Sequence, residues 1–231
     1  MKKLIGIGLL LAMSGFAMAA DEDAKVQERV DKAGTVLTEI MSAPDKGIPG
    51  DVIEKAKCIA IIPGLVSGGF VVGAKHGRGV ATCRTASGWS APAFVDITGG
   101  SYGLQIGAEK VDVVMLVMND KGMQHLLSSK FQLGGEAGVA AGPVGRQGTA
   151  DTDVTLNAEI LTYSRAKGVF AGVDLSGAAV KPDDDSTKAF YGKMVSFRDA
   201  LTGQVQAPAA AQSFLASVKQ ATSGAASATA H

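Results

Sequence analysis

The sequence predicts an α+β protein in which helices flank a glycine-rich, mainly antiparallel β-sheet of sandwich or barrel-like form. Near both ends of the chain, apolar residues recur at helical spacing. In the middle of the chain, apolar residues form short runs that are separated by glycine. The 30 glycines among 231 residues indicate tight turns and close backbone contacts. The 22 basic residues are matched by 22 acidic ones, so no net positive field exists to hold a nucleic acid.

The first residues are typical of an export signal. Lys2 and Lys3 precede the apolar run Leu4–Phe16, and Ala17-Met18-Ala19 supplies the small residues of a cleavage site. The run is shorter than the about 20 apolar residues of a membrane span. We therefore expect residues 1–19 to be a signal peptide and the mature chain to be periplasmic or secreted, without a transmembrane anchor.

The mature chain is expected to contain one domain, residues 20–203, followed by an Ala- and Ser-rich tail, residues 204–231, with a possible short helix. Cys58 and Cys83 are the two cysteines. In an oxidising compartment an even pair favours a disulfide, the alternative being two buried free thiols on neighbouring strands.

Three helices are predicted around the sheet. Residues 22–42 carry inward-facing apolar residues at helical spacing, Asp120 starts a helix that runs to about Ser129, and Asp183 caps a last helix that ends at Gly203. A weak helix over 209–220 would precede a disordered tail from residue 222. The inward-facing residues of the first helix are Val26, Val30, Ala33, Leu37 and Ile40.

The glycine-rich body is expected to consist of short strands and hairpins. Residues 75–79 and 98–101 are predicted to be turns, and Val111–Met118, a nearly continuous apolar run, is predicted to be a central strand. The other expected strands are Cys58–Ile62, Phe70–Val72, Val80–Thr82, Trp89–Ile97, Tyr102–Ala108, Val154–Tyr163, Gly168–Val173 and Ala178–Val180.

Several motifs resemble the SYLF domain family over about residues 24–202. They are Gly68-Gly69-Phe70-Val71-Val72-Gly73-Ala74, Gly88-Trp89-Ser90-Ala91-Pro92-Ala93-Phe94, Tyr102-Gly103-Leu104-Gln105-Ile106-Gly107, Val111-Asp112-Val113-Val114-Met115, Ala141-Gly142-Pro143-Val144-Gly145-Arg146 and Tyr163-Ser164-Arg165-Ala166-Lys167-Gly168-Val169-Phe170-Ala171-Gly172. The resemblance implies a lipid-binding domain without enzyme activity. Eukaryotic members bind phosphoinositide-bearing membranes, fungal members also bind actin, and bacterial members are exported.

The N-terminal segment departs from the basic amphipathic segment of the eukaryotic members. Residues 21–40 hold three basic and six acidic side chains, so anionic lipid would repel this segment, and its apolar stripe is better explained as a core-packing face. Actin binding is not expected in a periplasm.

Basic residues near glycines are the candidates for contact with lipid phosphates. Glycine-flanked turns let a phosphate approach backbone N–H groups, and each basic contact adds on the order of 1 kcal/mol. Solvated surface charge is the alternative for each of them. The candidate head-group residues are Lys75, His76, Arg78, Arg146, Arg165 and Lys167. Trp89 and Tyr102 could insert at an interface, although a lone Trp on a strand is more often in the core.

Catalysis has one weak signal. Gly99-Gly100-Ser101-Tyr102-Gly103 matches G-x-S-x-G, but the nucleophile elbow needs a helix after Ser101, where Leu104-Gln105-Ile106 reads as strand. His125, a downstream histidine, sits in an amphipathic helix. A tight turn explains these glycines better, so an enzyme is not expected.

The sequence contains no motif that predicts a cofactor or metal site. Asp183, Asp184 and Asp185 lack the alternating spacing of a calcium loop, and His76 and His125 lack a paired zinc spacing. No phosphate-binding loop fingerprint occurs in the sequence.

The expected function is non-catalytic recognition of anionic phospholipid head groups. The alternatives are a structural or stress-related envelope protein that binds protein partners and, third, a serine lipid hydrolase that uses Ser101.

Overall fold

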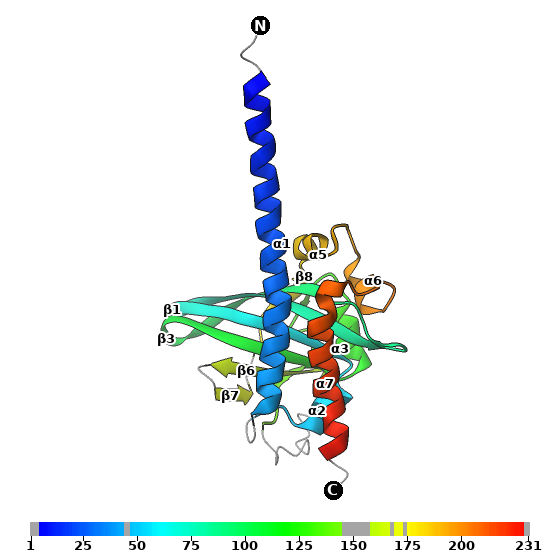
Figure 1. The fold of residues 1–231 in the computed structure, drawn as a ribbon. Coiled ribbons are helices and arrows are strands. Elements are labelled where there is room, and N and C mark those ends of the chain that lie inside the picture. Colours follow the sequence, from blue (N-terminus) through cyan, green and yellow to red (C-terminus); the bar gives the residue numbers. More distant parts are fainter. Residues whose placement is uncertain (1–4, 44–46, 145–157, 167–168, 173–174, 229–231) are drawn as a thin grey trace.

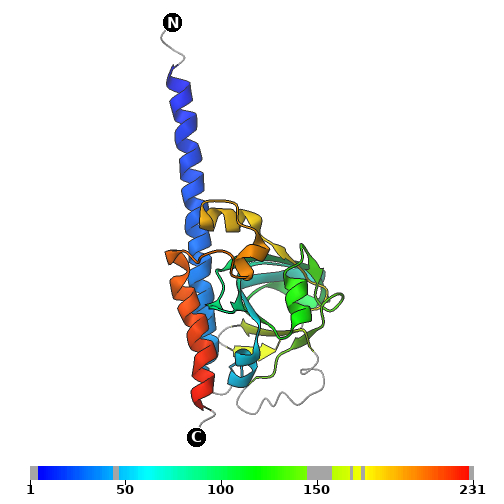
Figure 2. The same cartoon turned by 90° about the vertical axis from the view of Figure 1, so that its right-hand side faces the viewer.

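The computed structural model describes residues 5–43, 47–144, 158–166, 169–172 and 175–228. In this part of the chain eight strands form one mostly antiparallel sheet that curls into a half-barrel. The N-terminal helix and the C-terminal helix lie side by side against one side of it (Figures 1 and 2). The predicted α+β class, with a glycine-rich antiparallel sheet flanked by helices from both ends, is confirmed.

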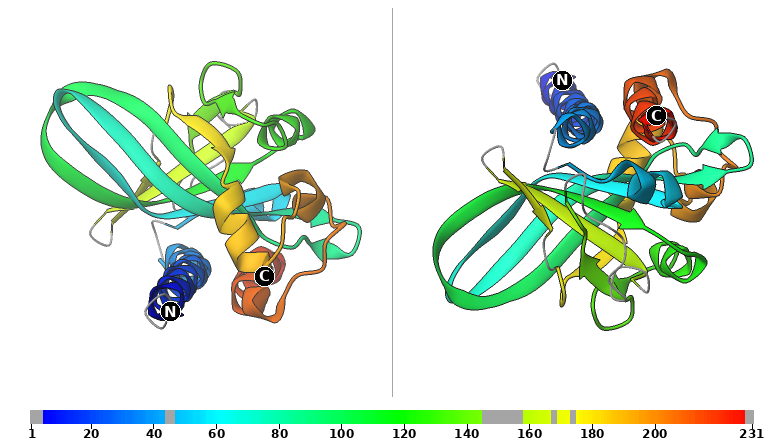
Figure 3. Two further views of the ribbon diagram at one scale, coloured as in Figure 1. Left: turned by 90° about the horizontal axis from the view of Figure 1, so that it is seen from above. Right: turned by 90° about the horizontal axis from the view of Figure 1, so that it is seen from below.

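Two long strands, β1 (Cys58–Thr85) and β3 (Ala93–Val117), pair antiparallel along nearly their whole length. The ribbon they form curves back on itself, as the views from above and below show (Figure 3). The backbone N–H of Arg84, near the end of β1, donates to the carbonyl of Lys57, just before its start, at 2.7 Å. Gly79 permits this crossing, because a Cβ atom there would lie 2.5 Å from the carbonyl oxygen of Ile61.

The predicted turns at 75–79 and 98–101 are therefore wrong. Both segments lie inside the long strands, where their glycines serve curvature and close crossing rather than chain reversal. The strand expected to stop at Ile62 continues past Pro63 through a register shift. The chain reverses instead after Thr85, where β2 (Gly88–Trp89) pairs back onto the end of β1.

The remaining strands extend the outer edge of β3 at two places. β6 pairs with the end of β3 and β8 with its beginning, while β7 and β5 flank β6, and β4 pairs with β8. These strands are β4 (Phe131–Gln132), β5 (Val139–Ala141), β6 (Ile160–Ala166), β7 (Val169–Gly172) and β8 (Ala179–Pro182).

The sheet separates two hydrophobic cores. Along β1, Cys58, Ala60 and Ile62 face one core, and the alternate residues Ile59 and Ile61 face the other, where α1 and α7 pack. The predicted central strand within β3 divides in the same way between the two cores. Burial of both faces explains why that stretch is apolar throughout rather than alternating.

The helices differ from expectation mainly near the C-terminus. The predicted inward face of the first helix is confirmed, with its five apolar residues at most 1% exposed. Asn119, rather than Asp120, caps the helix that follows β3. The helices are α1 (Ile5–Ser42), α2 (Gly50–Lys55), α3 (Asp120–Leu126), α5 (Asp184–Tyr191), α6 (Phe197–Leu201), the 3-10 turn η1 (Ala209–Ala211) and α7 (Gln212–Ala228).

The single helix predicted from Asp183 to Gly203 is two helices. Gly192, with φ of +66°, ends α5 in the left-handed conformation, and Met194, in the connection to α6, is 68% exposed. The tail expected to be disordered from residue 222 continues as α7, whose Phe214 and Val218 are fully buried in the core shared with α1. The last helix is thus part of the packed domain.

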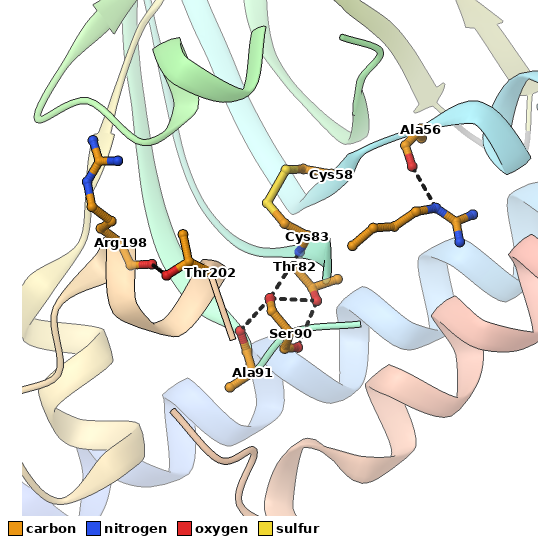
Figure 4. The surroundings of a disulfide bond; sticks show 9 residues. Ala56, Cys58, Thr82, Cys83, Ser90, Ala91, Arg198 and Thr202 are labelled. Atoms are coloured by element: carbon orange, nitrogen blue, oxygen red, sulfur yellow. Dashed lines mark hydrogen bonds between the residues drawn. A yellow bond between two sulfur atoms is a disulfide. The ribbon is translucent and has the colours of Figure 1, made fainter. Parts of the chain in front are cut away.

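A disulfide joins Cys58 and Cys83, as predicted (Figure 4). Both residues are fully buried, and the Cα atoms lie 3.9 Å apart. Ser90 completes the surroundings, since its hydroxyl accepts from the backbone N–H of Cys83 at 3.0 Å. The bond is compatible with an oxidising compartment. In the described residues, no helix combines the length and apolar character that a bilayer crossing requires.

Candidate functional site

The predicted head-group residues occupy two separate places on the sheet. Lys75, His76 and Arg78 lie in the C-terminal half of β1, and Arg165 lies on β6. Arg146 and Lys167 lie outside the described residues.

The first place is a charge cluster around Arg78. A row across three strands brings Arg78 opposite Asp96 and Asp96 opposite Lys181. His76 Nδ1 lies 3.4 Å from Asp96 Oδ1, and Lys181 Nζ lies 3.5 Å from Asp96 Oδ2. Arg78 Nε lies 3.6 Å from Asp183 Oδ2. We call these five residues the Arg78 cluster; in it, acidic partners offset much of the basic charge.

Arg29 of α1 also pairs with Asp183, at the same carboxylate oxygen as Arg78. Its Nη1 lies 3.5 Å from Asp183 Oδ2 and donates to the Ser186 hydroxyl at 2.8 Å, and its guanidinium carbon lies 5.8 Å from the centre of the Phe94 ring. Burial lowers the pKa of Arg29, and the carboxylate of Asp183 acts against that shift. Asp183 also accepts from the Ser186 backbone N–H at 3.1 Å, which confirms its predicted capping role. One carboxylate thus connects α1, β1 and α5.

The second place is built around Arg165. Its Nη2 and Nε lie 2.6 and 3.0 Å from Asp112 Oδ2, across the β3–β6 pair, and its Nη1 pairs with Glu39 of α1. The other oxygen of Asp112 accepts from the backbone N–H of Gly64 at 2.8 Å. Arg165 is 22% exposed and has two carboxylate partners, so its main visible role is to tie α1 to the sheet.

The two places do not form one patch. Arg78 lies 3.9 Å from Glu22, whereas Arg165 pairs with Glu39, and both glutamates belong to α1. Seventeen residues separate them, which corresponds to about 25 Å along a straight helix. The sequence analysis placed Arg78 and Arg165 in one group of head-group candidates, but in the fold they belong to two separate places.

Of these two places, the one on β1 is the more accessible; we call its residues Lys75, His76 and Arg78 the β1 group. The side chains of His76 and Arg78 are 58% and 42% exposed, and Lys75 is half-buried. Adjacent strand residues point to opposite faces, so His76 and Arg78 share a face and Lys75 lies on the other. This arrangement can present cations to an anionic surface.

Sequence reasoning missed the partners of these cations. Glu39, Asp96 and Asp112 come from α1 and β3, far in the chain from the cations that they hold, and no local pattern pairs them. The one available signal was Asp112 itself, a charged residue at the start of an apolar strand.

The other residues that the sequence singled out are explained by their contacts within the fold. Ser101 lies inside β3 opposite Gly73, and strand rather than helix follows it, so the elbow geometry is not formed. His125 Nε2 lies 3.5 Å from Glu159 Oε2, and Lys121 donates to Glu159 Oε1 at 2.6 Å. Among the described residues, no three His, Cys, Asp or Glu side chains gather in a way suited to a metal ion. Trp89 packs against α7, with its Nε1 3.3 Å from the Thr222 hydroxyl.

Comparison with known proteins identifies the fold's relatives. Residues 98–221, more than half of the chain, match the family described as Ysc84: Las17-binding protein actin regulator. The chain belongs to the Ysc84 family. This agrees with the SYLF motifs, which lie in the same region and extend upstream of it.

Curated relatives of the Ysc84-family chain come from animals and yeast. SH3 domain-containing YSC84-like protein 1 of Rattus norvegicus is 34% identical over 196 residues, covering 82% of this chain and 57% of the relative; the Homo sapiens protein of that name gives the same figures. Protein YSC84 of Saccharomyces cerevisiae is 32% identical over 175 residues, covering 74% of this chain and 37% of the relative. The chain thus spans little more than half the length of these relatives, or less.

Proposed function

We propose that this Ysc84-family chain is an exported, non-catalytic protein that binds the anionic head groups of a phospholipid surface. The observation that carries the proposal is the stretch of β1 that holds the exposed side chains of His76 and Arg78 and the half-buried side chain of Lys75, in a chain whose motifs resemble a lipid-binding family. Residues 1–19 act as the export signal, and the buried Cys58–Cys83 bond suits an oxidising destination such as a periplasm.

Contact with phosphate is electrostatic at this site. His76 and Arg78 keep part of their side chains in solvent although acidic neighbours hold them, and a phosphate would compete with Asp96 and Asp183 for them. Lys75 supplies a further cation from the opposite face of the strand. Arg165 adds less to phosphate binding, because two carboxylates already neutralise it. Arg146 and Lys167, which lie outside the described residues, stay candidates from the sequence alone.

The test is co-sedimentation of the protein, recovered from the periplasm of an expression host, with phosphatidylcholine vesicles that contain or lack phosphatidylglycerol. We expect binding to rise with the anionic lipid and to weaken with salt. The double variant Lys75→Glu/His76→Glu should lose about tenfold in vesicle affinity, because it reverses one charge and introduces one further negative charge, each worth about 1 kcal/mol or less. Lys193→Glu, an exposed lysine in the α5–α6 connection, is the matched control and should bind as the parent does. Equal binding by all three proteins would reject the β1 group as the head-group site.

A protein-binding role in the cell envelope is the second candidate. The family description names a protein ligand, Las17, and a groove of about 370 Å³ runs between α1 and α7. Polar residue types line it, although most of the surface they expose to the groove is apolar; the lining residues are Asp31, Gly34, Thr35, Thr38, Glu39, Ser213 and Ser217. Vesicle binding that ignores lipid charge, together with specific recovery of one envelope protein that Glu39→Lys abolishes, would favour this role.

A further inference from the structure

The ribbon of β1 and β3 contains a segment with no strand beside it. β8 pairs with β3 only as far as Thr98, and β6 pairs with it only from Asp112 onward. The other edge of β1 carries only β2, at Arg84 and Thr85. Among the described strands, residues 66–74 of β1 and 99–108 of β3 therefore form a two-stranded arm, which projects beyond α1 at the left of Figure 1.

The sequence of this arm does not suit a ribbon that stays in water. Neither segment contains an acidic or basic residue, whereas edge strands in water are usually protected by charged side chains, especially lysine. An isolated two-stranded ribbon is also only marginally stable in water. The large apolar and aromatic residues of the arm are Phe70, Val71, Val72, Tyr102, Leu104 and Ile106.

Basic residues stand where the arm joins the body. Lys75 is opposite Gly99 at one end of the arm, and Lys110 is opposite Val66 at the other. Val66 is 45% exposed, although it is a large apolar residue. Glu109 is the acidic residue at these junctions, so Lys75 and Lys110 leave a net positive collar. Long basic side chains in such a position can keep their charge at phosphate level while the adjacent surface enters an apolar layer.

We propose that this arm inserts into the interfacial layer of an anionic phospholipid bilayer, with Lys75 and Lys110 at the level of the phosphates. The proposal rests on the proposed function and names the part of the lipid that the protein engages beyond the head group. None of the described strands pairs with the two edges of this arm, and this limits its depth, because hydrocarbon offers unpaired backbone groups no hydrogen-bond partner. The arm therefore lies at the boundary between head groups and acyl chains and does not cross the bilayer.

Site-specific labelling tests the insertion. Cys58 and Cys83 are joined and buried, so one introduced cysteine is the thiol that reacts with an environment-sensitive fluorophore. Val71→Cys and Val72→Cys are both made, so that two successive positions of β1 within the arm are sampled. Gln220→Cys, at an exposed position of α7, is the control. With phosphatidylglycerol vesicles, label at position 71 or 72 should shift to the blue and be quenched by lipids brominated on the acyl chains, whereas label at position 220 should not respond.

Each other outcome overturns the insertion in a distinguishable way. Co-sedimentation without a shift at either position would leave head-group binding standing and reject insertion. A shift that needs no vesicles and grows with protein concentration would assign the arm to contact with a second copy of this chain. Failure to co-sediment at all would reject both proposals. As a label-free check, Val71→Asp should lower vesicle affinity about tenfold, because a charge at the interface opposes insertion. Ser87→Asp, in the exposed β1–β2 turn, should not.

Discussion

Cys58 and Cys83 lie at opposite ends of the same strand, and their disulfide brings the Cα atoms within 3.9 Å. The bond therefore closes the curve of β1 rather than joining two neighbouring elements. The backbone hydrogen bond from Arg84 to Lys57 closes the same curve beside it. The crossing of β1 over itself is thus held by one covalent and one backbone link.

Removal of the disulfide should lower the free energy of unfolding substantially. For a sequence separation of 25 residues, the chain-entropy estimate gives about 3 to 4 kcal/mol. Urea unfolding of Cys58→Ala/Cys83→Ala, compared with the oxidised parent, measures this difference. A loss below about 1 kcal/mol would mean that the crossing forms equally well without the bond.

The crossing also requires glycine at position 79. A Cβ atom there would lie 2.5 Å from the Ile61 carbonyl oxygen and 2.8 Å from the Ile62 side chain, so we expect Gly79→Ala to cost about 2 to 3 kcal/mol of unfolding free energy. Gly100→Ala is the matched control, since its nearest neighbour would lie 4.0 Å away. Urea denaturation of both variants should separate them clearly; equal midpoints would contradict the close approach.

Arg165→Met should destabilise the protein by about 1 to 2 kcal/mol. It leaves Asp112 and Glu39 without their shared cation, although partial exposure of the cluster reduces the penalty. Lys32→Met, which breaks the exposed pair with Glu28, should leave the unfolding temperature nearly unchanged. Thermal unfolding of the two variants checks the contrast, and a smaller effect at Arg165 than at Lys32 would refute it.

Two buried tyrosines should respond differently to loss of their hydroxyl groups. The Tyr163 hydroxyl is buried without a hydrogen-bond partner among the described residues, so Tyr163→Phe should be neutral or stabilising. Tyr191 donates to the Pro92 carbonyl at 2.6 Å, so Tyr191→Phe should cost about 1 kcal/mol. Urea midpoints measured side by side provide the test, and a larger loss for Tyr163→Phe would show that its hydroxyl has a partner.

The same tyrosines predict the alkaline limit of stability. Burial raises the pKa of both Tyr163 and Tyr191 above the ordinary value. The neutral forms are favoured in the folded state, so their contribution is complete below about pH 10 and declines as the pH rises toward the folded-state pKa values. Ultraviolet titration should show these two of the three tyrosines ionising only together with loss of folded structure. Their ionisation in the intact fold near pH 10 would contradict the burial.

Local patterns predicted the parts of the fold that depend on local physics. The inward face of α1, the cap by Asp183 and the cysteine pair all follow from spacing or residue chemistry. The long strands did not follow, because glycines at 77 and 79 have the same local pattern whether they form a turn or allow one strand to cross itself. Only the packing of Ile61 and Ile62 against them distinguishes the two cases.

The candidate site was predicted by residue type but not by arrangement. Basic residues near glycine were identified, yet the carboxylates that hold Arg78 and Arg165 come from helices and strands distant in the chain. A cation's partners set whether it is available to a ligand, and those partners depend on tertiary structure. The long α7 was underestimated for the same reason, because its small polar and alanine residues fold against α1 rather than by their own propensity.

The closed curve of β1 also changes what a protease can do to this protein. Residues 58–83 form a covalent ring, and Lys75 and Arg78, both trypsin sites, lie within it. A cut after either residue leaves two pieces that stay attached through the sulfur atoms and remain paired with β3. Such a nicked molecule would migrate as an intact chain on a denaturing gel and separate into fragments only after reduction.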